Sequence, residues 1–154
     1  MKLLISERKE SMRAQDVAVY REIQRNTDMA MKAIDTISDK VFDDGLAMHI
    51  ARQAIKYSEI HNEATKQLVA AKAVSYQGNH LSDMMLKAGI HYNTLLNTST
   101  GHIAEMMIKG SNMGMLEMEK ILNHNEEAGA KSTSLARQLI DFEGNNVKRL
   151  IKYL

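Results

Sequence analysis

The chain contains no proline among its 154 residues, and this absence constrains the fold more than any other feature. Proline breaks or kinks the interior of an α-helix, so a chain without it can form long, uninterrupted helices. Strand-rich domains draw on aromatic and β-branched residues. Aromatic residues make up only 5% of this chain, whereas methionine, a good helix former, occurs twelve times. The sequence therefore predicts an all-α protein.

Length and composition predict a single domain. Hydrophobic residues make up 44% and charged residues 25% of the chain, which is the balance of an ordinary globular protein. No Gly/Ser-rich linker or internal repeat divides the sequence. We therefore expect one domain over residues 1–154, with residues 1–13 as a looser N-terminal arm. The absence of cysteine excludes disulfides, thiolate catalysis and cysteine-based zinc sites.

The charge and hydropathy of the chain exclude two classes of partner. The formal net charge is +1, which gives no electrostatic footprint for nucleic acid. The only apolar run near the start, Leu3 to Ile5, is shorter than the roughly 7–15 residues of a secretory signal. No stretch reaches the roughly 20 apolar residues of a membrane-spanning helix. We expect a soluble, cytoplasmic protein without membrane insertion, and a homo-oligomer such as a dimer stays open.

Apolar residues recur at helical spacing in four long segments and one shorter one. The four long helices are predicted over residues 14–38, 45–74, 99–124 and 132–153, and the shorter one over 81–96. Short connections favour antiparallel neighbours. The sequence thus predicts an antiparallel four-helix bundle with an extra short helix between the second and third long helices. Asp43 or Asp44 would cap the second long helix. Whether the short helix continues into the third stays open.

The third long helix is expected to turn one apolar face to the core. That face would carry Ile103, Met106, Gly110, Met113, Glu117 and Ile121. Gly110 and Gly114 lie one turn apart, which would let another helix approach closely. The methionines of this segment cover several faces of one helix, so they favour core packing or an adaptable partner surface over a soft-metal site.

Several polar residues fall on or beside the predicted apolar faces: Asn26, His61, Glu117, Glu143 and Asn146. A buried carboxylate needs a partner, a proton or a metal ion. Helical bundles build di-metal sites from one Glu on each of two helices and a Glu-x-x-His pair on each of the other two. The candidate metal ligands in this chain are Glu22, Glu59, His61, Glu117 and Glu143.

The sequence departs from that di-metal pattern, because it contains no Glu-x-x-His. Asn62 and Asn146 stand three residues after a glutamate, and a neutral amide oxygen is a weak ligand for a transition metal. Each candidate therefore also has a structural interpretation. His61 would be a hydrogen-bonded core histidine, and Glu143 would pair with His, Lys or Asn. Asn26 and Asn146 could form a buried pair that fixes the helix register.

Four sequence blocks resemble those of a known superfamily: VAVYREIQRNTDMAMKAI, IARQAIKYSEIHNEATKQL, HIAEMMIKGSNMGMLEMEKILNH and LARQLIDFEGNNVKRLIKYL. Over residues 14–154 the chain resembles a divergent bacterial branch of the ferritin-like superfamily of four-helix bundles. The resemblance implies two iron or manganese ions and chemistry on oxygen, peroxide or stored iron. By position, the family's glutamates are matched by Glu22, Glu59, Glu117 and Glu143, and its histidines are replaced by Asn62 and Asn146.

Three hypotheses for the function follow. The first is a ferritin-like bundle without a standard di-iron site, serving as a structural or interaction module, and the missing Glu-x-x-His pairs favour it. The second is a di-metal oxidase or iron-handling protein with an altered ligand set. The third is a small-molecule binder inside a methionine-lined bundle, which a filled core without a cavity would argue against. The sequence leaves enzymatic activity open.

Overall fold

The computed structural model describes the backbone of residues 2–154, and the side chains of residues 14–79, 82–91 and 97–154. The helices are α1 (Lys2–Ile37), α2 (Asp44–Ala70), α3 (His80–Leu96), α4 (Thr100–His124) and α5 (Ala130–Leu150). Short 3-10 turns follow α1 at Ser38–Lys40 and α5 at Ile151–Tyr153. No strand occurs in residues 2–154, so the predicted all-α class is confirmed.

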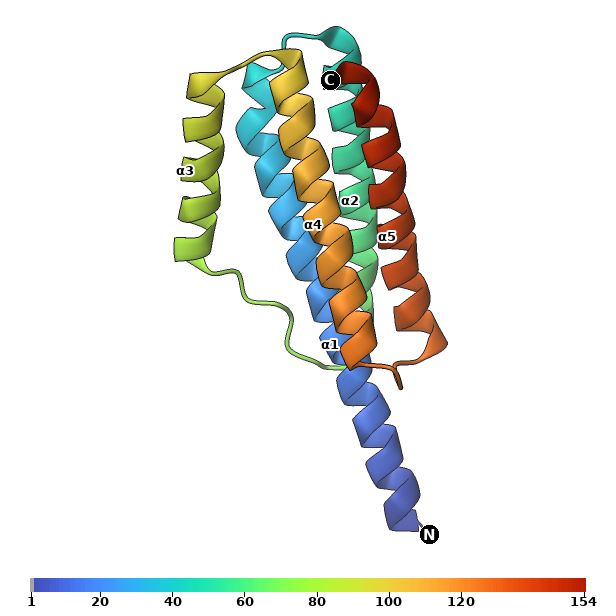
Figure 1. Cartoon of the computed structure of the whole chain (residues 1–154). Helices are drawn as coiled ribbons and strands as arrows, with labels where there is room; N and C mark the ends of the chain where they lie inside the picture. The colour runs from blue at the N-terminus through green and yellow to red at the C-terminus, as the bar shows by residue number, and fades with distance from the viewer. Residues whose placement is uncertain (1) are drawn as a thin grey trace.

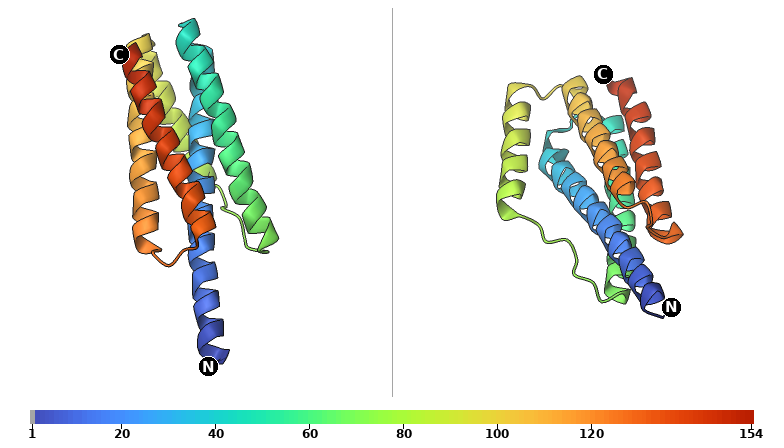
Figure 2. Two further views of the ribbon diagram at one scale, coloured as in Figure 1. Left: turned by 90° about the vertical axis from the view of Figure 1, so that its right-hand side faces the viewer. Right: turned by 60° about the horizontal axis from the view of Figure 1, so that its bottom comes forward.

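The chain reverses direction at every connection. Figure 1 shows it rising through α1, descending through α2, rising through α3, descending through α4 and rising through α5. The tightest packing joins α1 to α2 and α4 to α5, and α3 packs mainly against α1. The views in Figure 2 show α3 at one side of the other helices and the N-terminal part of α1 extending beyond them. None of the described helices is long and apolar enough to cross a membrane.

Side chains at the N-cap positions fix the beginnings of α2 and α4. Asp43 caps α2, as predicted, by accepting a hydrogen bond from the amide of Leu46 at 2.8 Å. Ser99 caps α4 through the amide of His102, which donates to the Ser99 hydroxyl at 3.3 Å. Because Asn97–Ser99 is not helical, α3 and α4 are separate helices, which settles the question that the sequence left open.

The end of α2 differs from its prediction. The sequence predicts an end near residue 74, but α2 ends at Ala70. Lys72 adopts a left-handed φ of 54°. The amides of Lys72 and Ala73 donate to the carbonyls of Val69 and Leu68, at 3.0 and 2.9 Å, which is the Schellman pattern usually closed by glycine. Lys72 therefore occupies the left-handed position that glycine usually takes at the end of a helix.

In the first, second and last long helices much of the apolar spacing corresponds to buried positions, although Ile151 and Leu154 near the end of the chain are 53% and 67% exposed. Their buried apolar residues include Val19, Ile23, Ile34, Ile37, Ile50, Tyr57, Ala64, Leu68, Leu139 and Leu150. Asn26, Glu143 and Asn146 are buried among them. The first helix begins at Lys2 instead of residue 14. The looser arm was predicted for residues 1–13, whose side chains lie outside the described residues.

The predicted face of α4 is wrong by about one position. Gly110 is exposed, Met113 is 66% exposed and Glu117 is only partly buried. The buried residues are Ile103, Ala104, Ser111, Gly114, Met118 and Leu122. One residue corresponds to about 100° of helix rotation. The rotation turns the small residues Ser111 and Gly114 toward Asn26 and Glu143, which hydrophobicity alone did not anticipate.

Candidate functional site

A cavity of about 620 Å³ lies between α1, α3 and α4, and residues of α2 and α5 complete its lining. We call it the central cavity. Its apolar wall consists of aliphatic and methionine side chains: Met29, Ala30, Ala33, Ile34, Ile37, Leu86, Ile90, Met106, Met107 and Met113. Leu86 and Ile90 come from α3, so the helix beside the main group forms one side of the cavity (Figure 1).

The inner part of the cavity is polar, and Glu143 is its centre. We call this part the polar end; it is formed by Asn26, Gln53, Tyr57, Ser111, Gly114 and Glu143. The Tyr57 hydroxyl donates a 2.6 Å hydrogen bond to Glu143 Oε2. Glu143 is only 2% exposed, and this burial raises the pKa of its carboxyl, while Ser111, Tyr57 and Asn146 oppose the rise. The site therefore favours a protonated carboxyl more than water does.

Gly114 allows Asn26 and Glu143 to meet at the wall of α4. The Asn26 side-chain amide donates to the carbonyl of Gly114 at 3.0 Å. A Cβ on Gly114 would lie 2.9 Å from Asn26 Oδ1 and 3.2 Å from Glu143 Oε1. Two acceptor oxygens thus converge on one point of the wall, which only a residue without a side chain leaves open.

The solvent side of the cavity carries a charged rim, formed by Glu22, Arg25 and Glu117. Arg25 contacts the Glu22 carboxylate through Nε at 3.0 and 3.1 Å and through Nη2 at 2.6 Å. Arg25 Nη2 also lies 3.9 Å from Glu117. The hydrogen bond with Glu22 is the largest cause that raises the pKa of Arg25. The guanidinium is therefore already paired within the rim.

Gln53 links the polar end to His49. The Gln53 side-chain amide lies 2.8 Å from His49 Nε2. Burial lowers the pKa of His49, and Arg149 and Arg52 lower it further. A neutral imidazole can accept this hydrogen bond, whereas a protonated one cannot.

The five predicted metal ligands are only partly brought together. Glu22, Glu117 and Glu143 line the central cavity, whereas Glu59 and His61 do not. Glu59 is 62% exposed and lies 3.4 Å from Lys56. His61 Nδ1 contacts the Thr27 hydroxyl at 2.9 Å.

No group of three or more His, Cys, Asp or Glu side chains that could hold a metal ion occurs among the described residues. The iron or manganese implied by the resemblance stays a prediction. The predicted pairing of Asn26 with Asn146 is replaced by the bond from Asn26 to Gly114.

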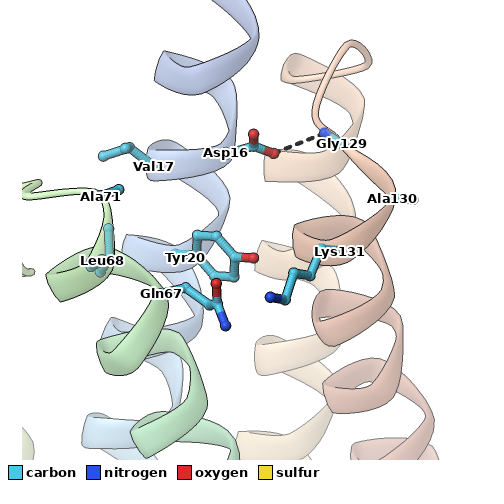
Figure 3. A pocket seen from close by; sticks show the side chains of 9 residues that line it. All are labelled: Asp16, Val17, Tyr20, Gln67, Leu68, Ala71, Gly129, Ala130 and Lys131. Atoms are coloured by element: carbon cyan, nitrogen blue, oxygen red, sulfur yellow. Dashed lines mark hydrogen bonds between the residues drawn. The ribbon is translucent and has the colours of Figure 1, made fainter.

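A second, smaller pocket of about 310 Å³ lies beside the beginning of α5 (Figure 3). Its acidic group is Asp16, which accepts hydrogen bonds from the Gly129 amide at 2.8 Å and the Ser132 hydroxyl at 2.6 Å. Asp16 therefore caps α5 from α1. Since this carboxylate already has a structural role, the central cavity is the better candidate site.

Sequence reasoning anticipated Asn26 and Glu143 as polar residues facing the core, but it missed Tyr57 and Ser111 as members of the site. Tyr57 follows the helical spacing of the apolar residues of α2, where a tyrosine gives no separate signal. The spacing of the small residues Ala104, Ser111 and Gly114 on one side of α4 could have indicated the correct face.

Comparisons of the chain with protein-family models, with curated proteins and with solved structures gave no match. The geometry of the central cavity is therefore the basis for a functional argument.

Proposed function

We propose that this protein binds a small, largely apolar molecule in the central cavity. The observation that carries the proposal is the cavity itself, with a volume of about 620 Å³ and a mostly apolar lining. Ligand pockets commonly have volumes of about 300–1,000 Å³ and combine apolar walls with a few convergent polar groups. The polar end provides such groups at one part of the cavity, so it would orient the ligand.

The methionines of the wall support this proposal. Met29, Met106, Met107 and Met113 line the cavity from α1 and α4. The methionine side chain is unbranched and polarisable, so it adapts to ligands of different shape. A wall of this kind suits a hydrocarbon body more than a rigid, highly polar substrate.

We further propose that the helices form an antiparallel four-helix bundle of the ferritin-like type. The path of the chain supports this arrangement: α3 carries it back along the other helices between α2 and α4 (Figure 1). The polar end also draws on α1, α2, α4 and α5, the four helices that would surround the bundle axis. In this interpretation α3 is the extra helix in the connection between the second and third bundle helices.

The binding proposal is tested by titrating the protein with the fluorescent probe N-phenyl-1-naphthylamine, which is neutral and apolar. We expect saturable binding to the wild type. Gly110 lines the cavity and has no atom within 4 Å of the position of an added Cβ, so Gly110→Phe should occupy the cavity without a clash at Cβ. The matched control is Gly89→Phe, because Gly89 also has an open Cβ position but does not line the cavity.

We expect Gly110→Phe to weaken probe binding by about tenfold or more, which corresponds to about 1.4 kcal/mol. Gly89→Phe should bind the probe as the wild type does. Absence of saturable binding, or equal binding by the two variants, would refute the proposal.

Iron or manganese binding is the second candidate function. It rests on the resemblance to ferritin-like bundles, because the described residues bring no three candidate ligands together. Elemental analysis after anaerobic addition of Fe(II) or Mn(II) tests it, with one or two retained ions per chain expected and their loss in Glu143→Ala. A protein that retains neither probe nor metal would fit the structural or interaction module instead.

A further inference from the structure

The smaller pocket, of about 310 Å³, contains a buried hydroxyl group without a partner. Tyr20 lines this pocket from α1 and is only 7% exposed. Figure 3 shows its hydroxyl directed toward the side of the pocket that α5 forms. This hydroxyl makes no hydrogen bond with any of the described residues. Because a buried polar group without a partner costs free energy, the Tyr20 hydroxyl points to a bound group as its partner.

The α5 side of the pocket favours an anionic group. Lys131 lines it with an ammonium group that forms no ion pair within the described part of the chain (Figure 3). The same wall is the amino-terminal end of α5 (Ala130–Leu150), where the helix dipole attracts negative charge. The Tyr20 hydroxyl and the Lys131 ammonium are both donors, so one carboxylate can accept from both.

The pocket also contains negative charge, so it does not suit a simple anion. Asp16 accepts the bonds from the Gly129 amide and the Ser132 hydroxyl through Oδ1, which leaves Oδ2 as an acceptor for a further group. Burial raises the pKa of Tyr20, and the negative charges of Asp16 and Glu63 raise it further. Tyr20 is therefore protonated and donates, while the two carboxylates favour a ligand that also carries a positive charge.

We propose that the smaller pocket binds a free α-amino acid with an apolar side chain. The carboxylate of the ligand accepts from Tyr20 and Lys131, and its ammonium group donates to Asp16. The apolar side chain contacts Val17 and Leu68 of the lining. A zwitterion adds no net charge to the pocket, whereas a simple acid would meet Asp16 and a simple amine would meet Lys131.

The size of the pocket agrees with a ligand of this class. Its volume of about 310 Å³ lies at the lower end of the roughly 300–1,000 Å³ of known ligand sites. The pocket shares no lining residue with the central cavity. The two sites can therefore be tested separately.

The experiment titrates the isotope-labelled, full-length protein with L-leucine and follows its backbone amides by NMR. We expect saturable shifts of the amides of Gly129, Ala130 and Lys131, which border the pocket. Isocaproate is leucine without its amino group, and isoamylamine is leucine without its carboxylate. Each should bind about tenfold more weakly than leucine, because each loses one set of charge-assisted hydrogen bonds.

Two variants test the carboxylate end of the site. Tyr20→Phe removes only the hydroxyl, so it should weaken leucine about tenfold and leave isoamylamine, which has no carboxylate, unchanged. Lys131→Met should weaken leucine about threefold, because an exposed ion pair contributes less than a buried one. Lys66→Met is the matched control, since Lys66 is likewise exposed but lies outside the pocket, and it should bind leucine as the wild type does.

The outcomes decide the proposal at each step. Absence of saturable shifts at residues 129–131 with leucine would overturn it. If isocaproate or isoamylamine binds as tightly as leucine, the site does not recognise a zwitterion and the assignment is wrong. Unchanged leucine binding in Tyr20→Phe would also overturn it, because the hydroxyl would then have no role in the site. None of these outcomes affects the central cavity, from which leucine should not displace N-phenyl-1-naphthylamine.

Discussion

Gly110 and Gly114 of α4 provide the sharpest test of the structure, because they lie one turn apart and have opposite surroundings. An added Cβ on Gly110 would have no neighbouring atom within 4 Å. An added Cβ on Gly114 would lie 2.9 Å from Asn26 Oδ1 and 3.2 Å from Glu143 Oε1. The perturbation is the same substitution, to alanine, at each position.

The expected magnitudes follow from two opposing effects. Alanine is favoured over glycine within a helix by about 1 kcal/mol, so Gly110→Ala should raise the free energy of unfolding by about that amount. Gly114→Ala gains the same propensity, but an extra atom in a packed region costs about 1–3 kcal/mol. Gly114→Ala should therefore be less stable than Gly110→Ala by about 1–3 kcal/mol.

The assay is urea unfolding followed by far-UV circular dichroism on the wild type and both variants. A change in stability alone shifts the midpoint and leaves the slope of the free energy against urea unchanged. Equal stabilisation by both substitutions would refute the placement of Asn26 and Glu143 against Gly114. Destabilisation by both would show that Gly110 is in close contact with another element.

Three further variants test other parts of the structure. Burial raises the pKa of Glu143 above its ordinary value of 4.5, so above pH 4.5 the native state binds more protons than the unfolded state, and the wild type loses stability as pH rises through the folded pKa. The stability of Glu143→Gln relative to the wild type, measured by urea unfolding at several pH values, should therefore increase over that window. A difference independent of pH would contradict the burial of this carboxyl. Lys72→Gly should stabilise the protein by about 1 kcal/mol in the same assay, because a left-handed conformation costs other residues about 1–2 kcal/mol. The control Lys66→Gly, at an exposed position inside α2, should destabilise the protein by about 1 kcal/mol. A loss of stability in Lys72→Gly would disprove the left-handed turn. Asp16→Ala removes the cap of α5 and should lower the free energy of unfolding by about 1–2 kcal/mol, measured by thermal unfolding. An unchanged free energy of unfolding would mean that Asp16 does not cap α5.

Much of the helical fold could be predicted because three helices carry a regular apolar face. The spacing of Val19, Ile23 and Ile34 is that of one side of a helix, and these residues are buried. The α4 prediction failed because hydrophobicity and burial disagree there. Met113 is apolar and exposed, while Ser111 is polar and buried. Ser111 faces the core because its side chain hydrogen-bonds Glu143 of α5, a partner that the sequence of α4 does not show.

The candidate site could be predicted only in part for a related reason. Asn26 and Glu143 interrupt apolar faces, so the sequence marks them as unusual. Tyr57 gives no such signal, because its ring is apolar enough to belong to a core face and only the tertiary structure directs its hydroxyl to Glu143. The cavity itself depends on the space left between α3 and the helices beside it, and no local pattern encodes that space.

The arrangement of the central cavity argues for a ligand on energetic grounds as well. A buried carboxyl with a raised pKa lowers stability at neutral pH, and an apolar residue of similar volume often replaces a buried charge without loss of stability. Gly110 costs helix stability while its Cβ position is open. Both features line one cavity. Natural sequences accept such local losses mainly at functional sites. A bound molecule with an apolar body would fill the open space beside Gly110 and cover the polar end at Glu143, so one occupant accounts for both.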